Sequence, residues 1–387
     1  MSETRYLIGD TRNVLAAMPA ASVDLVLSSP PFLALRSYLP ADYPDKLLEI
    51  GSEATPAEFL DVLLEVTALC RRVLTPTGTL AFELGDTYSG SGQSGWERDA
   101  GGYRREVRSA ASAAGVLQQT RQLSSAWPQA KSLCMIPEAY RMSLAYGRNI
   151  LTGATSPAGQ WRVRNVVRWC RPNPPVGALG DKFRPATSEM VIACTSAKRW
   201  FDLDAVRTDN PAGAPPLDWW EIPTEPYLGS HYATWPTELL RIPILAMCPA
   251  QVCRTCGEPR RRIVGDAEYV KPGGALHEFH GDRFEQHESG ANRRKVTGSD
   301  NGNMSRQAPT LGWTDCGCST DGTHWRRGHV LDPFGGTGTT AVVANGNGRD
   351  CTLIDIDARN LDLARERVGM FMNIETPNRQ ITETGAL

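Results

Sequence analysis

Five residues near the start of the chain, 28–32 (Ser-Ser-Pro-Pro-Phe), form a compact unit of hydrogen-bonding and stacking groups. Two consecutive prolines exclude helix and sheet pairing, fix the backbone and remove two N–H donors, so that local carbonyl groups can face a ligand. A hydroxyl group precedes them and an aromatic ring follows. Taken alone, the segment favours a simpler interpretation, a proline-rich strand exit with a buried phenylalanine and no chemical role.

A second segment whose residues could bind a ligand lies near the other end of the chain, at residues 332–340 (Asp-Pro-Phe-Gly-Gly-Thr-Gly-Thr-Thr). It lies between a predicted strand and a predicted helix. Glycines there let the backbone approach a ligand, and the helix N-terminus offers free N–H groups. Asp355, at the end of the next predicted strand, is placed to bind two ribose hydroxyl groups. These features indicate a nucleoside-containing cofactor at the carboxyl ends of parallel strands.

The position of this turn argues against a nicotinamide dinucleotide, although residues 336–341 formally fit the pattern G-x-G-x-x-A. In a sequential dinucleotide fold the glycine turn opens the domain and several strand–helix units follow it. Here one clear strand and one helix follow, so the rest of the sheet must come from the N-terminal half. We therefore predict a permuted order, with the cofactor half last.

The elements that must position both segments alternate between strand and helix. The helix beginning at Pro56 has the clearest signals, because Thr55 is a suitable N-cap and Glu58 completes a capping box. Short links between strand, helix and strand predict parallel α/β construction. Strands are predicted at 6–8, 23–27, 79–83, 161–170, 329–332 and 351–354, a hairpin at 189–194 with 199–201, and helices at 11–18, 56–74, 136–146, 237–247 and 358–372.

The two segments in this order resemble the amino-group DNA methyltransferases that use S-adenosylmethionine, in their permuted β-class arrangement. The resemblance covers most of the chain. It rests on residues 29–32 and 332–338, with support from Gly9-Asp10, the segment 231–236 and Asp355. It implies an α/β, Rossmann-like S-adenosylmethionine methyltransferase fold with a mostly parallel sheet, a circularly permuted motif order and inserted segments. It also implies double-stranded DNA as the partner.

The resemblance assigns roles to residues by their position in these motifs. The Ser29 hydroxyl and the Pro30 carbonyl would accept the two N–H bonds of an exocyclic amine, and Phe32 would stack on a flipped base. A helix cap is the alternative role for Asp10. The implied catalytic residues are Ser29, Pro30, Pro31 and Phe32, and the implied cofactor residues are Asp10, Pro236, Asp332, Phe334, Gly335, Gly336, Gly338, Thr339 and Asp355.

The serine at the first position of the tetrapeptide resembles the cytosine-N4 branch of the family, whereas aspartate or asparagine more often marks the adenine-N6 branch. Branches cross this rule, so cytosine N4 is favoured and adenine N6 stays the alternative. A catalytically inactive DNA-binding module and a nicotinamide-dependent oxidoreductase are more remote. Phenylalanine in place of tyrosine at position 32 is a departure that keeps the stacking surface.

A cysteine cluster between residues 248 and 318 is a second departure from the simplest family members. Cys253 and Cys256 form a C-x-x-C-G turn, and Cys316 and Cys318 could supply a second pair of ligands for structural zinc. The long spacer and the C-x-C form lower the specificity of this signal. Cys248 is a competing ligand, and unliganded reduced cysteines are the alternative. Basic clusters at 260–262 (three arginines) and 293–295 (Arg-Arg-Lys) favour a DNA-facing role over a solvated insertion.

Bulk composition is ordinary for a globular protein. The chain has 387 residues, 41% apolar and 22% charged, enough for one large domain or two smaller ones. No apolar run approaches the ~20 residues of a bilayer span, and the N-terminus shows no signal peptide, so a cytoplasmic location is expected. The ten cysteines should then be reduced or metal-bound. A net charge of −2 gives no argument for a nucleic-acid partner, which needs local basic patches.

The predicted organisation divides the methyltransferase domain into two halves with insertions. The segments are 1–88 (catalytic half), 89–133 (flexible insertion), 134–247 (rest of the catalytic half and target recognition), 248–318 (zinc-ribbon-like insertion), 319–375 (cofactor half) and 376–387 (tail).

Overall fold

The structure is a computed structural model of the chain. It describes residues 2–35, 37–89, 96–98, 104–106, 125–174, 181–207, 214–225, 235–266, 268–270, 305–320, 322–369 and 372–375. Most of the predicted insertion at 89–133, the segment 231–234, the basic cluster at 293–295 and the tail at 376–387 lie outside the described residues. Of the helices in the described part, none combines the length and apolar character that a bilayer span requires.

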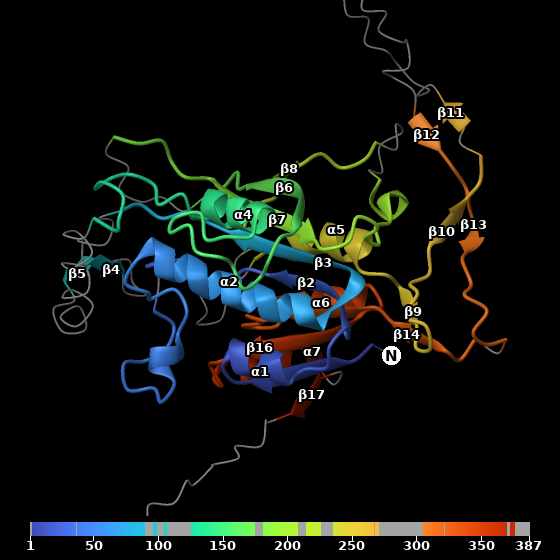
Figure 1. The fold of residues 1–387 in the computed structure, drawn as a ribbon, viewed down its shortest axis with the longest axis horizontal. Coiled ribbons are helices and arrows are strands. Elements are labelled where there is room, and N and C mark those ends of the chain that lie inside the picture. Colours follow the sequence, from blue (N-terminus) through green and yellow to red (C-terminus); the bar gives the residue numbers. More distant parts are fainter. Residues whose placement is uncertain are drawn as a thin grey trace, which may run out of the picture.

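A nine-stranded sheet forms the centre of the molecule, in the order β17-β1-β16-β15-β2-β3-β7-β6-β8 (Figure 1). Neighbouring strands are parallel except at β7, which is antiparallel to both β3 and β6. The prediction of an α/β fold with a mostly parallel sheet is confirmed. The strands are β1 (Thr4–Ile8), β2 (Val23–Ser28), β3 (Leu74–Leu84), β6 (Arg162–Cys170), β7 (Thr187–Cys194), β8 (Trp219–Glu221), β15 (His329–Asp332), β16 (Asp350–Asp355) and β17 (Met372–Glu375).

Strands from the two ends of the chain are interleaved in this sheet. β15 and β16 lie between β1 and β2, with Val330 opposite Leu25 and Tyr6 opposite Leu353. Because these strands are parallel, the loops that follow them meet at one edge of the sheet. We call this the carboxyl edge and the opposite one the amino edge.

Helices cover both faces of the sheet and bury two apolar clusters against it. One face carries α1 (Thr11–Ala17), α2 (Pro56–Val73) and α4 (Ile136–Tyr146). The other carries α5 (Thr237–Met247), α6 (Thr339–Gly346) and α7 (Asn360–Val368). β2 is buried along its whole length, as expected for a central strand covered on both sides. Two short 3-10 helices lie in loops, at Lys46–Leu48 and Leu203–Val206.

The start of α2 follows the sequence prediction in detail. The Thr55 hydroxyl accepts from the Glu58 N–H, and the Glu58 carboxylate accepts from the Thr55 N–H, which completes the capping box. α5 is one helix with Pro243 inside it. The three arginines of β6, at 162, 164 and 168, are all exposed, although a bulge between Val163 and Asn165 breaks the regular alternation.

Three predicted element boundaries are wrong. β3 begins at Leu74, directly after α2, instead of at residue 79. The segment 199–201 is not a strand, because β7 pairs with β3 and β6 instead. The closing helix ends at Val368, and Met372–Glu375 forms the edge strand β17 beside β1. A strand that gains its partner only from a distant segment carries no local signal.

Small antiparallel strand pairs lie outside the main sheet. β9 (Gln251–Cys253) pairs with β14 (Trp325–Arg327), and β10 (Arg262–Val264) pairs with β13 (Thr310–Trp313). We call these four strands and the described turns between them the cysteine ribbon. The pairing of β14 extends it beyond the predicted boundary at 318. The remaining pairs are β4 (Trp96–Arg98) with β5 (Arg104–Glu106) and β11 (Glu268–Val270) with β12 (Ser305–Gln307).

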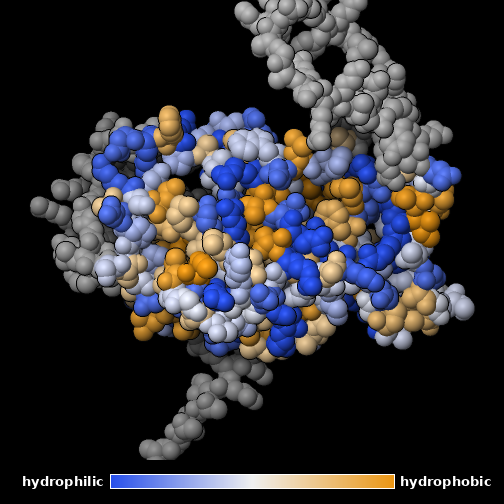
Figure 2. Space-filling view, turned by 45° about the horizontal axis from the view of Figure 1, so that its top comes forward, coloured by the Kyte–Doolittle hydropathy of each residue, from blue (hydrophilic) through white to orange (hydrophobic). Residues whose placement is uncertain are grey.

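The cysteine ribbon lies at the amino edge of the sheet. β14 leads into β15 through Gly328 alone, so the ribbon adjoins the beginning of that parallel strand. Figure 1 shows β9, β10, β13 and β14 at the right of the molecule, and β4 and β5 at the left. On the described residues of the face in Figure 2, apolar and hydrophilic side chains are interspersed, as is usual for a surface in contact with water.

Candidate active site

A cavity of about 540 Å³ opens at the carboxyl edge of the sheet. Residues that follow five different strands line it: Asp10 after β1, Ser29 after β2, Gly85 after β3, Phe334 after β15 and Ile356 after β16. Predicted residues from both ends of the chain therefore share one cavity, at the place where open parallel sheets bind ligands.

The glycine turn after β15 is fastened to the end of β16. The Gly335 N–H donates to the Ile354 carbonyl at 2.7 Å, and the Gly336 N–H donates to the Asp355 carboxylate at 2.8 Å. A Cβ added to Gly335 would lie 2.7 Å from the Cβ of Leu353, so only glycine permits this close approach. At Gly335 and Gly336 the turn thus presents backbone to the cavity.

Asp355 lies at the wall of the cavity, and its carboxylate already accepts backbone hydrogen bonds. One oxygen accepts from Gly336, and the other accepts from the Asp357 N–H at 2.7 Å. Burial raises the pKa of Asp355 to about 6, against the lowering effect of these hydrogen bonds. The Asn360 side chain also donates to this carboxylate. Because a carboxylate has about four acceptor positions, one position is left for a hydroxyl group of a ligand.

Gly338 and Thr339 begin α6 and differ in their relation to the cavity. Gly338 has a φ of +82° and is the N-cap, a left-handed conformation that favours glycine. A Cβ added there would lie 3.2 Å from the Ala364 Cβ, so Gly338 packs against α7 and does not line the cavity. Thr339 lines the cavity, and its hydroxyl accepts from Arg367 at 2.7 Å.

Asp332 joins the two halves of the site. It is buried, and its carboxylate accepts from the Ser28 hydroxyl at 2.5 Å, from the Thr340 hydroxyl at 2.5 Å and from the Phe334 N–H at 3.0 Å. Burial raises its pKa, and these hydrogen bonds oppose the rise. Ser28 ends β2 and directly precedes Ser29, so this contact fixes the glycine turn relative to residues 29–32.

Ser29 donates its hydroxyl hydrogen to a buried glutamate. The Ser29 Oγ lies 2.6 Å from Oε2 of Glu83, which is 3% exposed and lies on β3. Burial raises the pKa of Glu83, while hydrogen bonds from Ser188 and Ser29 and the charge of Arg171 act in the other direction. Because the hydroxyl hydrogen is committed to Glu83, the lone pairs of Ser29 are left to accept hydrogen bonds from a ligand.

Phe32 closes one side of the cavity and is half-buried. A Cβ added to Gly85 would lie 2.6 Å from the Phe32 ring, so the glycine makes space for that ring against the end of β3. Gly51, at a φ of +99°, would meet the Phe32 carbonyl at 3.0 Å if it carried a Cβ. Two glycines far apart in the sequence therefore leave room for the ring and the backbone of Phe32.

Asp10 and Pro236 have structural roles that the sequence left open. The Asp10 carboxylate caps α1 by accepting from the N–H groups of Arg12 and Asn13, and it pairs with the Arg12 guanidinium at 2.9 Å. Asp10 also lines the cavity. Pro236 is the N-cap of α5 and does not line the cavity, whereas the neighbouring Trp235 does.

Sequence analysis missed several cavity residues that come from neighbouring strands. Glu83, Trp169 and Arg171 line the cavity from β3 and from the end of β6. The charge of Glu83 within the apolar run Leu80–Leu84 was an available signal, because a lone acid in a buried strand needs a partner. The partner itself depends on the β2–β3 register, in which Ser28 lies opposite Phe82.

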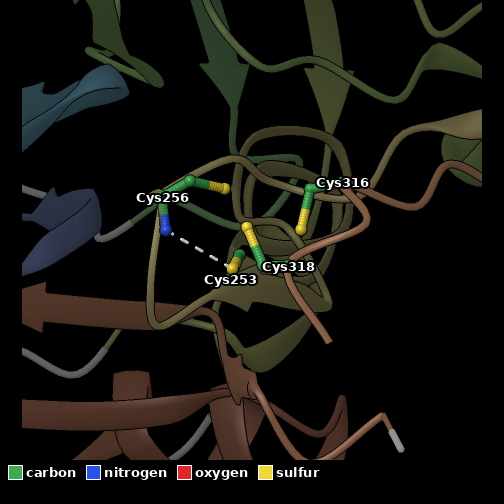
Figure 3. Close-up of side chains that lie close together, drawn as sticks. All are labelled: Cys253, Cys256, Cys316 and Cys318. Carbon is green, nitrogen blue, oxygen red and sulfur yellow. Dashed lines mark hydrogen bonds between the residues drawn. The ribbon is translucent and has the colours of Figure 1, made fainter. Parts of the chain in front are cut away.

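The four predicted zinc ligands also come together, at the other edge of the sheet. The Sγ atoms of Cys253, Cys256, Cys316 and Cys318 all lie within 4.8 Å of one another (Figure 3). Cys248 is buried and is not part of this group. The tetrad lies in the cysteine ribbon at the amino edge, whereas the cavity opens at the carboxyl edge.

Comparison with known proteins places the chain in a family. A family model described as "DNA methylase" matches residues 322–366, which include the glycine turn and Asp355. The type II methyltransferase M.XycI of Xanthomonas campestris pv. cyanopsidis is 31% identical over 240 residues, 60% of this chain and 69% of that protein. The type II methyltransferase M.Cfr9I of Citrobacter freundii is 29% identical over 241 residues, 62% of this chain and 70% of that protein.

The chain therefore belongs to the DNA amino-methyltransferases of the N4/N6 family, as its motifs predicted. Among solved structures, the PvuII DNA methyltransferase (cytosine-N4-specific) aligns with 95% of this chain and 86% of its own, at 14% identity and a TM-score of 0.48. The protein is an enzyme that methylates DNA.

Proposed function

We propose that the enzyme moves a methyl group from S-adenosylmethionine to the N4 amine of a cytosine flipped out of double-stranded DNA. The observation that carries the proposal is the shared cavity. Ser29, with its hydroxyl hydrogen committed to Glu83, opens into the same space as the glycine turn at 335–336.

The cofactor end of the cavity has the groups that a nucleoside and an amino acid require. Asp355 would accept from the ribose hydroxyl groups, and the backbone at Gly335 and Gly336 would lie against the methionine and ribose. Asp10 and Phe334 would complete the contacts. Asp332, which also borders the cavity, would position the turn by accepting from the Phe334 N–H. The bound cofactor supplies an electrophilic methyl group on a sulfonium ion.

The base end of the cavity can activate a poor nucleophile. An exocyclic amine has its lone pair delocalised into the ring, and two acceptors on its N–H bonds favour a tetrahedral nitrogen whose lone pair points at the methyl carbon. Ser29 Oγ and the Pro30 carbonyl would be these acceptors. Pro31 leaves no competing N–H group at that turn.

The reaction balances through Ser29 and Glu83. As the new C–N bond forms, the C–S bond breaks and its electron pair returns to sulfur. The nitrogen then carries one proton too many. Ser29 would take that proton while passing its own to Glu83, whose raised pKa makes its carboxylate a better proton acceptor.

The base must leave the DNA duplex to reach this cavity, because its amine is not accessible to the tetrapeptide while the base is stacked and paired. Phe32 and Trp235, which both line the cavity, offer aromatic faces for stacking on the flipped base. The preference for cytosine N4 over adenine N6 follows from the serine at position 29. Its neutral hydroxyl would accept the hydrogen bond from the amine, a role that aspartate or asparagine more often fills in the adenine-N6 branch.

Nucleoside mass spectrometry of DNA from cells that express the enzyme tests the proposal directly. We expect N4-methylcytosine, and none in cells expressing Ser29→Ala. Ser22→Ala is the matched control, since Ser22 precedes β2 at its opposite end, does not line the cavity and donates its hydroxyl hydrogen to the Pro19 carbonyl at 2.8 Å. N6-methyladenine instead would overturn the choice of base. Normal methylation by Ser29→Ala would overturn the role of the tetrapeptide.

A further inference from the structure

We propose that Cys253, Cys256, Cys316 and Cys318 bind one zinc ion, and that this zinc fastens the cysteine ribbon to the amino edge of the sheet without taking part in methyl transfer. The proposal is independent of the base and cofactor assigned above. It rests on the convergence of the four sulfur atoms, on the backbone around them and on their place in the fold.

The spacing of the sulfur atoms suits a tetrahedral thiolate site. Zinc–sulfur bonds of ~2.3 Å at tetrahedral angles place the sulfur atoms about 3.8 Å apart. The four Sγ atoms lie within 4.8 Å of one another, so small rotations of the side chains bring them into range. Figure 3 shows that they point toward one common space from two separate turns.

The backbone of both turns is shaped around the sulfur atoms. The N–H groups of Thr255 and Cys256 donate to the Cys253 sulfur at 3.3 and 3.4 Å, which stabilises negative charge on it. Gly257 and Gly317 have φ values of +75° and +70°. A Cβ on either would meet nothing within 4 Å, so these glycines serve the tight turns and not close packing.

His324 supports the site from outside the set of four sulfur atoms. It is 7% exposed, its Nε2 lies 3.6 Å from the Cys316 sulfur, and its Nδ1 is buried without a hydrogen-bond partner among the described residues. An imidazole in this position can donate to a ligating thiolate and orient it. Its carbonyl also accepts from the Arg254 N–H, which joins the two turns.

The ribbon is tied to the beginnings of the parallel strands. Cys253 on β9 lies opposite Trp325 on β14. Next to it, Arg326 forms an ion pair with the buried Asp24 at the start of β2, at 2.6 Å. A second attachment joins Arg262 of β10 to Asp202 at 2.8 Å. These contacts lie at the opposite edge from Ser29 and the glycine turn.

This placement separates the metal from the chemistry. A zinc ion in the tetrad could not reach a base or a methyl donor in the cavity, and four protein ligands leave no open position for a substrate. Its effect would instead be to hold β14, and through it the start of β15, the strand that ends in the glycine turn. The DNA-facing role predicted for the basic residues of this segment stays a prediction.

Metal analysis of the full-length enzyme tests the site. Protein purified without chelators should contain one zinc ion per chain. Cys318→Ala should lose it, while the same change at Cys248 and the change His324→Gln should retain it. Absence of zinc in the wild type, with no uptake of added zinc or cobalt, would overturn the proposal. Loss of the metal in Cys248→Ala, or its retention in Cys318→Ala, would overturn the ligand set.

A measurement on the wild type covers the case in which Cys318→Ala does not fold. Titration with a mercurial reagent should release the zinc in step with the modification of four thiol groups. A metal-sensitive dye measures the zinc released. Zinc-free enzyme should unfold at a temperature lower by roughly 5 °C or more, yet methylate DNA at a similar rate while folded. Loss of methyl transfer without loss of folding would overturn the structural role.

Discussion

Buried acids near the ends of the sheet strands have two kinds of partner, which Asp24 on one side and Glu83 and Asp332 on the other illustrate; some acids at the carboxyl edge, such as Asp10 and Asp357, also pair with a guanidinium. At the amino edge, Asp24 is 3% exposed, and its carboxylate accepts from the Arg326 guanidinium at 2.6 and 3.1 Å and from the His329 N–H at 2.9 Å. At the carboxyl edge, Glu83 and Asp332 are as deeply buried, but their hydrogen bonds come from hydroxyl and N–H groups.

The kind of partner corresponds to the role of the acid, structural at Asp24 and chemical at Glu83. The buried ion pair of Asp24 with Arg326 joins the start of β2 to β14. In Glu83 and Asp332 the hydrogen bonds do not fully offset the effect of burial. Their pKa is therefore raised, and they keep an affinity for protons. Acids of this second kind gather where a proton must move.

The largest effect should follow from neutralising Glu83. We expect Glu83→Gln to lower kcat by about 10²–10³-fold, because it removes the proton acceptor and weakens the orientation of Ser29. The affinity for S-adenosylmethionine should stay within error. Single-turnover methylation of a defined DNA duplex, with cofactor binding measured by calorimetry, separates the two.

Ser188→Ala is the matched control, because Ser188 also bonds to Glu83 but does not line the cavity. It should cost far less activity than Glu83→Gln. The double variant Ser29→Ala with Glu83→Gln should be no slower than either single variant, since both act in one step. Additive losses would show that the two residues act separately.

A smaller effect, on stability and not on chemistry, should follow from Asp24→Asn at the amino edge. The neutral amide leaves Arg326 without its charged partner, so the free energy of unfolding should fall by about 2–3 kcal/mol. Folded enzyme should keep its kcat. Asp362→Asn is the control, because its ion pair with Arg365 is exposed and should be worth under about 1 kcal/mol. Equal losses in urea denaturation for both variants would contradict the comparison of the edges.

The sequence alone was sufficient to predict motifs whose residues are all contained in one short segment. The tetrapeptide at 29–32, the glycine turn and the capping box at Thr55 each lie within one short segment, and the structure shows the turns and cap expected there. Glu83 escaped prediction because its partner is set by the pairing of β2 with β3. β17 escaped because an edge strand is defined by its neighbour β1. The position of the cysteine ribbon depends on which end of β15 it adjoins, and a motif does not carry that information.

The smallest effect should be a pH dependence of cofactor binding through Asp355. Its pKa in the folded chain is raised to about 6, so between its unfolded value of ~3.9 and that pH the native state binds more protons than the unfolded state. The contribution of Asp355 to stability is therefore present at low pH and falls as the pH rises through this window. Ribose hydroxyl groups donate to the ionised form, so cofactor binding should strengthen over the same range.

We expect the Kd for S-adenosylmethionine to be about tenfold weaker at pH 5 than at pH 7, since one carboxyl group must lose its proton before it accepts the ribose. Calorimetry at the two pH values, in buffers with different ionisation enthalpies, would detect the released proton. Asp355→Asn should bind more weakly and lose the pH dependence. If the Asn variant keeps it, the proton belongs to another cavity acid, and Glu83 is then the candidate because it shares the cavity and the raised pKa.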